Sequence, residues 1–599
     1  MANTSLLDIY IRNAEQSGTN VAALVKQDGR YQERSWKQLV DASRETASAL
    51  LAHGVKPGDR VNIVSNTRLE WVITDLAIAY AGGISVPVYP SSMADECSHI
   101  CKDSGSVIAF AEDEKQVEKL SSVRGEIGDL RLVVQMTGTP VSSDGWVIGW
   151  KDFIAKADTS RDAAELQKRR EDIDKDSPFT LIYTSGTTGR PKGVVLTHDA
   201  IAYEAEAIEA INVLRQDDIQ LFFLPLSHSF GRVLESGWLS CRFIMAFGES
   251  MNTIRDNLGE VRPTVMCGVP RVFEKFYSAV VQKGTAGGGA KAKLFDLAVE
   301  LSQKNGEAGV QGKSLGLRDR LAFTVLKRLV FAKVGAGLKE LLGGRMRILV
   351  SGGAPLSPKI SWFFRDAGLE ILEGYGLTET TAASFVNRPN LNHIGTVGQP
   401  LPGTQVKIAG DGEILIKGRG VMKEYWNNRE ATDEVLKDGW LATGDIGTIE
   451  KDGTLKITDR KKDIIVTAGG KNVAPQNIEN LIKTHKLVSQ AVVHGEKRKY
   501  LTLVVTLDPD VLKQTAKELG FGNGSIEELT QRPEIEKLVH NWIDEVNTKL
   551  ASYEGIKKFS ILDHDFTIEG GEMTPSLKIK RKVVNERYKK VFDGMYETA

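Results

Sequence analysis

Short apolar runs alternate with longer helix-like stretches along most of the chain. Residues 60–65 (RVNIVS) predict a strand, and residues 69–81 predict the helix that follows it. A later apolar run, residues 346–350 (MRILV), predicts another strand after a long helical region. Alternation of this kind is typical of α/β folds, so we predict an α/β protein without internal repeats.

A run from Tyr183 to Gly193 (YTSGTTGRPKG) concentrates hydroxyl groups, glycines and one lysine. It joins two stretches, residues 179–183 and 193–198, that each predict a strand. Glycines let backbone N–H groups approach an anion, while the hydroxyls and Lys192 add donors and charge. The order differs from a Walker loop, because a proline precedes the lysine and a glycine follows it. The run predicts a polyphosphate-binding loop; the alternative is a plain surface turn.

Composition and charge narrow the class of protein. A chain of 599 residues is longer than one core normally supports, which predicts two or more domains. The 77 Lys and Arg residues nearly balance the 78 Asp and Glu residues, so we expect no nucleic-acid partner. Four cysteines do not make a disulfide framework and are typical of the reducing cytosol. Cys97 and Cys101 flank His99, but without a second cluster they indicate ordinary cysteines rather than metal ligands.

Membrane signals are limited to one segment. The N-terminal residues lack the continuous apolar core of a signal peptide, and no run of about eighteen apolar residues predicts a span. Residues 317–342, however, mix leucine, valine and phenylalanine with lysine and arginine. Such a basic amphipathic helix lies on anionic lipid or packs on its own protein, and both interpretations stay open. We expect a cytoplasmic protein, with peripheral membrane contact as the alternative.

Further motifs follow the Gly/Thr-rich run in a recognisable order. They are residues 351–355 (SGGAP), 373–380 (EGYGLTET), 443–447 (TGDIG), 459–463 (DRKKD) and 574–581 (TPSLKIKR). Together with the run at 183–193, they resemble the motifs of the adenylate-forming enzymes, the superfamily of acyl-CoA synthetases, luciferases and peptide-synthetase adenylation domains. The resemblance spans nearly the whole chain.

The resemblance implies a domain organisation. A large N-terminal domain of several subdomains, with β-sheets flanked by helices, is expected over residues 1–458, including a helix-rich insertion at about 284–342. A small mobile α+β domain is expected over residues 459–599, turning about a hinge at Asp459. Gly469, Gly470 and Lys471 resemble the loop that this domain brings to the site for thioester formation; a tight hairpin turn is the plainer interpretation.

The implied activity is a two-step ligation. A carboxylic acid reacts with ATP to give acyl-AMP and pyrophosphate, with Mg²⁺ as cofactor, and coenzyme A then takes the acyl group. The insertion and residues 268–273 (GVPRVF) resemble the long-chain fatty acyl-CoA synthetases, which implies a fatty acid of roughly twelve or more carbons, whose burial stabilises binding. Two alternatives remain: a fatty acyl-AMP ligase that loads a carrier protein, and a non-catalytic nucleotide- or lipid-binding module. The sequence leaves the oligomeric state open, with a homodimer among the options.

The resemblance also implies roles for individual residues. Lys578 would bridge the carboxylate and the α-phosphate during adenylation; its neighbour Lys580 is the competing candidate, and a solvated charge run is the plain alternative. Glu379 and the Thr184 hydroxyl would hold Mg²⁺, although Glu379 could instead cap a helix after Thr378. Residues implied to bind ATP or AMP are Thr184, Ser185, Gly186, Thr187, Thr188, Gly189, Lys192, Gly352, Gly353, Ala354, Glu373, Gly374, Tyr375, Gly376, Thr378, Asp445, Ile457, Arg460 and Lys578.

Within that set, Asp445 and Arg460 match positions that hold the ribose, and the ring of Tyr375 offers a stacking face for adenine. An Asx-turn is the alternative for Asp445. His228, in the run 224–230 (LPLSHSF), matches a histidine beside the acyl carboxylate. It would orient the substrate or gate its tunnel; a general-base role toward the thiol and a structural role are the other interpretations. Lys192, Glu379, His228 and Lys578 are thus the implied catalytic residues.

Overall fold

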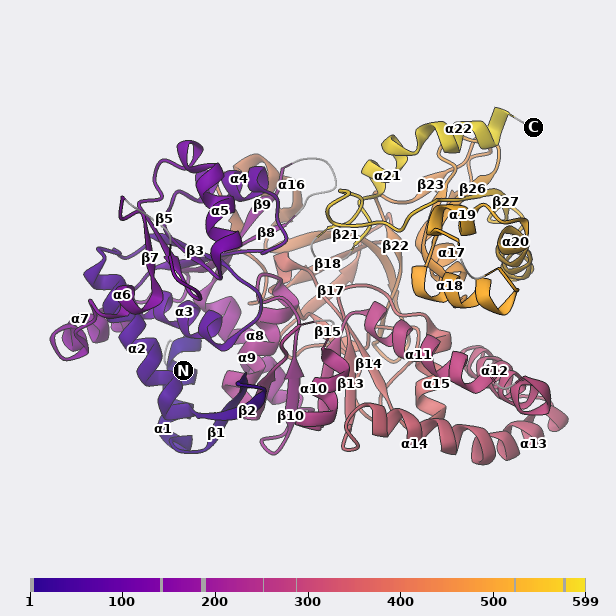
Figure 1. Ribbon diagram of the computed structural model, residues 1–599, viewed down its shortest axis with the longest axis horizontal. Coiled ribbons are helices and arrows are strands. Elements are labelled where there is room, and N and C mark those ends of the chain that lie inside the picture. The colour runs from indigo at the N-terminus through magenta and orange to yellow at the C-terminus, as the bar shows by residue number, and fades with distance from the viewer. Residues whose placement is uncertain are drawn as a thin grey trace.

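A computed structural model describes residues 5–597 except 141–143, 185–189, 251–252, 287, 522–523 and 575–577. Figure 1 shows a large body built from the N-terminal three quarters of the chain and a smaller C-terminal body at its upper right. The two predicted elements near residue 60 are present as β3 (Arg60–Val64) and α3 (Leu69–Tyr80). The α/β class predicted from the sequence is confirmed.

Two sheets form most of the large body. One has the order β19 (Glu424–Tyr425), β9 (Lys192–Thr197), β8 (Pro178–Thr184), β4 (Ile84–Val88), β3, β5 (Ser106–Ala111), β6 (Leu132–Gln135), β7 (Val147–Gly149). The other has the order β16 (Gln399–Pro400), β15 (Phe385–Val386), β14 (Ile371–Tyr375), β13 (Ile348–Ser351), β12 (Val265–Gly268), β10 (Ile219–Phe222), β11 (Ile244–Phe247), β1 (Val21–Gln27), β2 (Arg30–Ser35). Their central strands are parallel and nearly all apolar, as expected for strands covered on both faces.

Helices cover these sheets and join them into one core. They are α1 (Leu6–Ser17), α2 (Trp36–Ala52), α3, α4 (Ala94–Ser104), α5 (Glu114–Ser122), η1 (Arg124–Glu126), α6 (Trp150–Ile154), α7 (Thr159–Glu171), α8 (His198–Ala210), α9 (Ser229–Cys241), α10 (Ile254–Val261) and α15 (Pro358–Asp366). Trp36, Trp71 and Trp238, from α2, α3 and α9, are fully buried in the same core. The rings of Trp36 and Trp238 lie 5.4 Å apart.

The helix-rich insertion predicted from the sequence follows β12. It contains α11 (Pro270–Thr285), α12 (Gly289–Val310), α13 (Leu317–Leu326), a π-helical turn η2 (Lys327–Phe331) and α14 (Ala332–Leu341). Because α11 begins at Pro270 and runs through Gly284, the helical region starts earlier than the expected residue 284. Figure 1 places α12 and α13 at the lower right, below the C-terminal body.

A third sheet connects the two bodies. It has the order β17 (Gln405–Ile408), β18 (Glu413–Lys417), β21 (Trp440–Ile449), β20 (Leu436–Lys437), with β22 (Leu455–Arg460) paired to β21. Two short elements complete this part of the chain: η3 (Thr378–Thr380), which contacts β9, and α16 (Arg429–Val435), which contacts β20 and β21. Because β22 continues to Arg460, it carries the chain directly from this sheet into the C-terminal body.

The C-terminal body has its own sheet and its own apolar core. Its strands are β25 (Val488–His494), β26 (Leu501–Leu507) and β27 (Ile556–Ile561), with a two-stranded hairpin of β23 (Ile465–Val466) and β24 (Asn472–Val473). Its helices are α17 (Pro475–Ile482), α18 (Pro509–Glu518), α19 (Ile526–Thr530), α20 (Pro533–Asn547), α21 (Arg581–Arg587) and α22 (Lys589–Glu597). The core residues that pack this sheet begin at Ile465. Among the helices that the structure describes, none has the length and apolar character that a bilayer span requires.

Candidate active site

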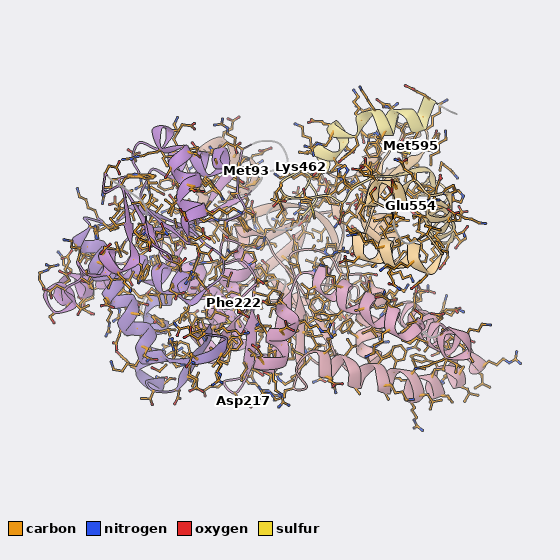
Figure 2. The ribbon with its side chains drawn as sticks, in the orientation of Figure 1. Met93, Asp217, Phe222, Lys462, Glu554 and Met595 are labelled. Atoms are coloured by element: carbon orange, nitrogen blue, oxygen red, sulfur yellow. The ribbon has the colours of Figure 1, made fainter. Side chains whose placement is uncertain are left out.

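A large cleft separates the two bodies and contains many of the implied site residues. Its volume is about 3180 Å³, and both bodies contribute to its walls. Met93 and Lys462, labelled at the top of Figure 2, line it from the two sides. Implied site residues that line the cleft are Gly353, Ala354, Glu373, Gly374, Tyr375, Gly376, Asp445, Ile457, Asp459, Arg460 and Lys578.

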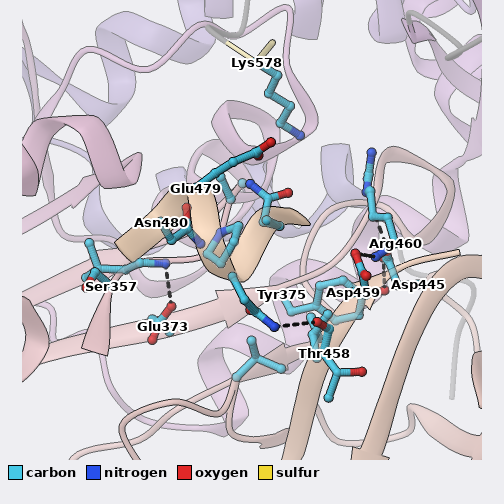
Figure 3. A pocket seen from close by; sticks show the side chains of 18 of the residues that line it. Ser357, Glu373, Tyr375, Asp445, Thr458, Asp459, Arg460, Glu479, Asn480 and Lys578 are labelled. Carbon is cyan, nitrogen blue, oxygen red and sulfur yellow. Dashed lines mark hydrogen bonds and ion pairs between the residues drawn. The ribbon is translucent and has the colours of Figure 1, made fainter. Parts of the chain in front are cut away.

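Asp445 lies at the centre of a polar cluster in this cleft (Figure 3). The strand pairing of β21 with β22 places Arg460 opposite Asp445. The Arg460 Nε donates to Asp445 Oδ1 at 3.2 Å, and the Tyr375 hydroxyl donates to Asp445 Oδ2 at 2.6 Å. Asp445 is buried, so these two donors compensate a charge withdrawn from water. Its side chain bonds to Tyr375 and Arg460, which favours the ribose interpretation over an Asx-turn.

The Tyr375 hydroxyl was not anticipated from the sequence, which indicated only a stacking role for its ring. The ring lies against Phe385, with centroids 6.1 Å apart, in the sheet that carries β14 and β15. Burial and the neighbouring carboxylate raise the pKa of Tyr375 well above its usual value, so the hydroxyl stays protonated and remains a donor. It therefore orients Asp445.

Lys578 reaches the same space from the C-terminal body (Figure 3). Its backbone N–H donates to Thr574 Oγ1 at 3.0 Å, and Thr574 N–H donates to the Lys578 carbonyl at 2.8 Å. Burial, together with the nearby Arg460 charge, lowers the pKa of Lys578 to about 8, while Asp445 and Glu379 act in the opposite direction. The lysine is thus placed among charges of both signs, of which Asp445 and Arg460 lie on the third sheet and Glu379 lies on η3. Residues 575–577, between the two bonded positions, lie outside the described part.

The glycines beside the cluster allow close backbone packing. A Cβ on Gly376 would lie 1.4 Å from the Ala382 carbonyl oxygen, so a side chain there is sterically excluded. Gly353 has a φ of +82°, and a Cβ on Gly352 would meet the Phe230 ring at 3.1 Å. Because these glycines have no side chains, the backbone itself forms this part of the cleft wall.

Glu373 lies on β14 in the same wall and accepts a hydrogen bond from the Leu356 backbone N–H at 3.0 Å. Burial raises the pKa of Glu373 to about 7, and the Leu356 bond opposes the shift. The side chain therefore exchanges a proton near neutral pH and can donate as well as accept a hydrogen bond.

A second group of implied residues is held on the sheet edge formed by β8, β9 and β19. Thr184 pairs with Lys192 across β8 and β9, and Tyr425 of β19 pairs with Val194. The Lys192 ammonium lies 5.1 Å from the centre of the Tyr425 ring. The hydroxyl of the same tyrosine donates to Glu379 Oε1 at 2.8 Å. Tyr425, which the sequence motifs did not single out, thus links Lys192 to Glu379.

The loop between β8 and β9 is described only in part. Ser185, Gly186, Thr187, Thr188 and Gly189 lie outside the described residues. At the end of the loop, the Pro191 carbonyl lies 2.9 Å from His99 Nε2, so the ring donates this bond. The histidine between the two cysteines therefore contacts the end of the predicted phosphate loop.

His228 forms the N-cap of α9, where its Nδ1 accepts a hydrogen bond from Phe230 N–H at 3.0 Å. Burial, together with the Lys578 charge, lowers the pKa of His228 to about 3. A neutral ring with an accepting Nδ1 carries its proton on Nε2, so this side chain is a hydrogen-bond donor at neutral pH. That state suits an orienting role better than a general-base role.

Asp459 and the 469–471 turn belong to the implied moving parts. Asp459 lies on β22, and its Oδ1 accepts from the Arg460 backbone N–H at 2.6 Å. Burial raises the pKa of Asp459 to about 6, although the hydrogen bond from the Arg460 backbone N–H acts in the opposite direction. Gly469, Gly470 and Lys471 form the exposed hairpin turn between β23 and β24 and do not line the cleft.

Direct contacts hold the C-terminal body in this arrangement. The Arg271 guanidinium of α11 donates to Ser489 Oγ at 3.1 Å and lies 3.4 Å from an Asp508 carboxylate oxygen. The Lys359 ammonium lies between the Tyr277 and Trp542 rings, 6.0 and 5.6 Å from their centres. These contacts join the large body to the C-terminal body in the arrangement in which Lys578 faces Asp445.

Comparison with known proteins identifies the class. Residues 11–426 match the AMP-binding enzyme family, and residues 462–599 match the AMP-binding enzyme C-terminal domain. The chain belongs to this adenylate-forming family, so it is an acyl-adenylate-forming ligase that binds ATP and AMP. The family predicted from the motifs is confirmed.

Particular relatives and structures are similar over most of their length. The chain is 38% identical over 575 residues to the long-chain-fatty-acid–CoA ligase FadD15 of Mycobacterium bovis, covering 95% of this chain and 93% of the relative. It is 31% identical to the peroxisomal long chain acyl-CoA synthetase 7 of Arabidopsis thaliana, covering 99% and 86%. The fold matches the A domain of a carboxylic acid reductase from Segniliparus rugosus, solved with AMP and a carboxylic acid, with a TM-score of 0.75, 22% identity, and coverage of 100% and 95%.

Proposed function

We propose that the protein activates a long-chain fatty acid with ATP and transfers the acyl group to coenzyme A. The observation that carries the adenylation step is the meeting of Lys578 with Asp445 and Arg460 across the cleft. The names of the relatives at 38% and 31% identity support the choice of a long-chain acid and of CoA as acceptor.

In the first step, a carboxylate oxygen of the acid bonds to the α-phosphorus, and the bond to pyrophosphate breaks. Lys578 supplies the positive charge that holds the carboxylate beside the α-phosphate and stabilises the charge that develops there. Asp445, fixed by Tyr375 and Arg460, accepts hydrogen bonds from the ribose hydroxyls. His228 donates from Nε2 to the acyl carboxylate.

In the second step, the CoA sulfur bonds to the acyl carbonyl carbon, the thiol proton is lost, and AMP leaves. Lys578 has no part in this step, so the C-terminal domain can turn away at Asp459 and bring the turn at residues 469–471 to the cleft. Glycines in that turn let a narrow chain such as pantetheine pass close to the backbone.

The donor set at Glu379 fits Mg²⁺. A carboxylate and a hydroxyl are oxygen ligands, and Mg²⁺ commonly takes one or two protein ligands beside phosphates. Because the Tyr425 hydroxyl bonds to Glu379 Oε1, the carboxylate is oriented while Oε2 has no protein donor in the described structure. Glu379 and Thr184 would hold the ion, which supplies charge neutralisation to the phosphates when bound.

Product analysis tests the proposed function. The purified protein is incubated with ATP, Mg²⁺ and palmitate, with and without CoA, and the products are identified by mass spectrometry. Palmitoyl-CoA and AMP that form only with CoA would support the proposal. Palmitoyl-AMP that persists with CoA would indicate a carrier-protein ligase, and no product across a series of acids would favour a binding module.

The pH dependence of adenylation should show a falling limb near pH 8. The protonated Lys578 is the active form, so kcat/KM for pyrophosphate exchange is expected to drop about tenfold per pH unit above its pKa of about 8. A Lys578→Arg variant, whose guanidinium keeps its charge to above about pH 12, should lose that limb whatever its absolute rate. A limb that is the same in both proteins would assign it to another group.

Substitution of Glu379 by alanine should raise the Mg²⁺ concentration needed for half-maximal adenylation by roughly tenfold or more, because it removes the proposed carboxylate ligand of the ion. The measurement is a Mg²⁺ titration of pyrophosphate exchange. Tyr425→Phe, which removes only the bond to Glu379 Oε1, should give a smaller shift in the same direction. Unchanged metal dependence in the alanine variant would remove Glu379 from the metal site.

Loss of the Lys359 charge should weaken the arrangement that places Lys578 in the cleft. A Lys359→Met variant keeps the apolar stem but loses the cation–π contacts with Tyr277 and Trp542, each worth roughly 1 kcal/mol. We expect adenylation to slow about five- to tenfold while transfer from supplied acyl-AMP does not slow. Equal slowing of both half-reactions would contradict a selective effect on this arrangement.

A further inference from the structure

A row of exposed apolar side chains runs along the insertion. Leu317, Leu321, Val325 and Leu329 are 75%, 61%, 55% and 59% exposed, although side chains of this kind are normally covered. They follow one another at intervals of four along α13 and η2, so they share one side of the helix. We refer to these four residues as the apolar stripe.

The other side of the same helix already provides its packing. Phe323, Leu326, Phe331 and Leu338 are buried in the main core. The rings of Phe323 and Phe331 pack edge to face, and Phe331 packs in turn against Phe363 of α15. The insertion is thus anchored without the apolar stripe, which leaves the stripe available to something outside the chain.

The charge around the apolar stripe is strongly positive. From Leu317 to Leu341 the sequence carries six Lys or Arg residues and two acidic residues, whereas the whole chain has a net charge of −1. Lys327 is paired with Asp366. In the described structure the other five basic residues, Arg318, Arg320, Arg328, Lys333 and Lys339, form no ion pair. Basic side chains flanking apolar ones fit a surface that is apolar inside and negatively charged outside.

Residues next to the apolar stripe in the sequence line the cleft. Val310, Lys313 and Arg320 of the same helical region line the cleft. Val310, the last residue of α12, is also 63% exposed. Figure 2 shows side chains of this region projecting outward at the lower right edge of the molecule.

We propose that the apolar stripe docks the protein on the surface of an anionic lipid bilayer. The four apolar side chains enter the boundary between headgroups and acyl chains, and the basic residues beside them meet the lipid phosphates. Docking in this way brings the cleft close to the bilayer. Under the proposed function, a long-chain acid that partitions into lipid would then have a short path to the site.

Vesicle sedimentation of the full-length protein tests the proposal. At low salt, we expect binding to phosphatidylcholine vesicles containing about one third phosphatidylglycerol to be at least tenfold stronger than binding to phosphatidylcholine alone. The double variant Leu321→Ser with Val325→Ser should bind the mixed vesicles roughly tenfold less tightly. The matched control is Leu391→Ser with Ile449→Ser, two side chains exposed to 50% and 42% outside the insertion, which should bind as the unmodified protein does.

Charge reversal provides an independent arm. The triple variant Arg318→Glu, Arg328→Glu and Lys333→Glu should lose the preference for phosphatidylglycerol, while a control triple, Lys115→Glu, Lys168→Glu and Arg215→Glu, makes the same change in net charge elsewhere and should keep it. All of these residues are exposed, so circular dichroism should show an unchanged fold.

Two outcomes would overturn the proposal. Equal loss of binding in the two charge-reversal triples would show that net charge alone attracts the protein to vesicles. A protein that ignores both vesicles but forms a dimer that Leu321→Ser with Val325→Ser disrupts would assign the stripe to a second copy of the chain. Vesicle binding requires no turnover, so a protein that binds vesicles but makes no acyl-CoA would contradict the proposed function alone.

Discussion

Replacing Lys578 with alanine should slow acyl-AMP formation by roughly 100- to 1,000-fold. The Lys578 ammonium reaches the cleft from the C-terminal body and interacts there with the charges of Asp445 and Arg460. Arg460 is already engaged by Asp445, so it is not free to replace the lysine at the α-phosphate. Transfer of supplied acyl-AMP to CoA should stay within a few-fold of the unmodified enzyme, because that step begins after the charge on the α-phosphate has developed.

The two half-reactions must be measured separately for this result to be informative. Pyrophosphate exchange reports adenylation, and the thioester absorbance of acyl-CoA made from synthetic acyl-AMP reports transfer. Lys580→Ala is the matched control, since Lys580 also lines the cleft and lies two residues away. It should leave adenylation within a few-fold of normal. A larger loss of adenylation in the Lys580 variant than in the Lys578 variant would contradict the role proposed for Lys578. An equal loss of both half-reactions in the Lys578 variant would contradict it as well.

The sequence predicted those parts of the fold whose pattern is local. The strands around the phosphate loop were expected at residues 179–183 and 193–198, and the structure has them as β8 and β9. Their apolar runs are buried on both faces, which produces a strong signal in the sequence. The end of the strand before the expected hinge at Asp459 was not predicted, because β22 continues to Arg460 through pairing with β21. Partner strands fix that ending, and a single sequence does not show which strands pair.

For the candidate site, too, the sequence indicated the residues that belong to local motifs but not the contacts that depend on the fold. Motifs indicated Lys578, Asp445 and Glu379 as candidate site residues, but nothing local indicated that the Tyr375 hydroxyl would donate to Asp445, 70 residues away. Tyr425 was missed for the same reason, since its contacts with Lys192 and Glu379 depend on the short strand β19 adding to β9. Buried tyrosine hydroxyls usually have a hydrogen-bond partner. That rule could have flagged both residues without naming their partners.

Changing Asp445 to asparagine should raise the KM for ATP by roughly 10- to 100-fold, the cost of losing one or two charge-assisted hydrogen bonds. Asparagine has nearly the same shape, so the Tyr375 hydroxyl can still donate to its oxygen. In the unmodified protein, Asp445 Oδ1 accepts a hydrogen bond from Arg460 Nε at 3.2 Å. In the variant, the asparagine NH₂ group would face the Arg460 guanidinium, and two donors cannot form a hydrogen bond. The ribose would also lose a negatively charged acceptor.

The same substitution should move the falling limb of the adenylation pH profile to lower pH. Asp445 is one of the two carboxylates that favour the protonated form of Lys578, so its loss lowers the pKa of the lysine below about 8. Asp433→Asn, at an exposed carboxylate paired with Arg429, is the control and should change neither KM nor the limb. If Asp445 has only a structural role, the substitution should lower thermal stability and the rate but leave the falling limb at the same pH. An unmoved limb would therefore contradict an effect of Asp445 on the pKa of Lys578.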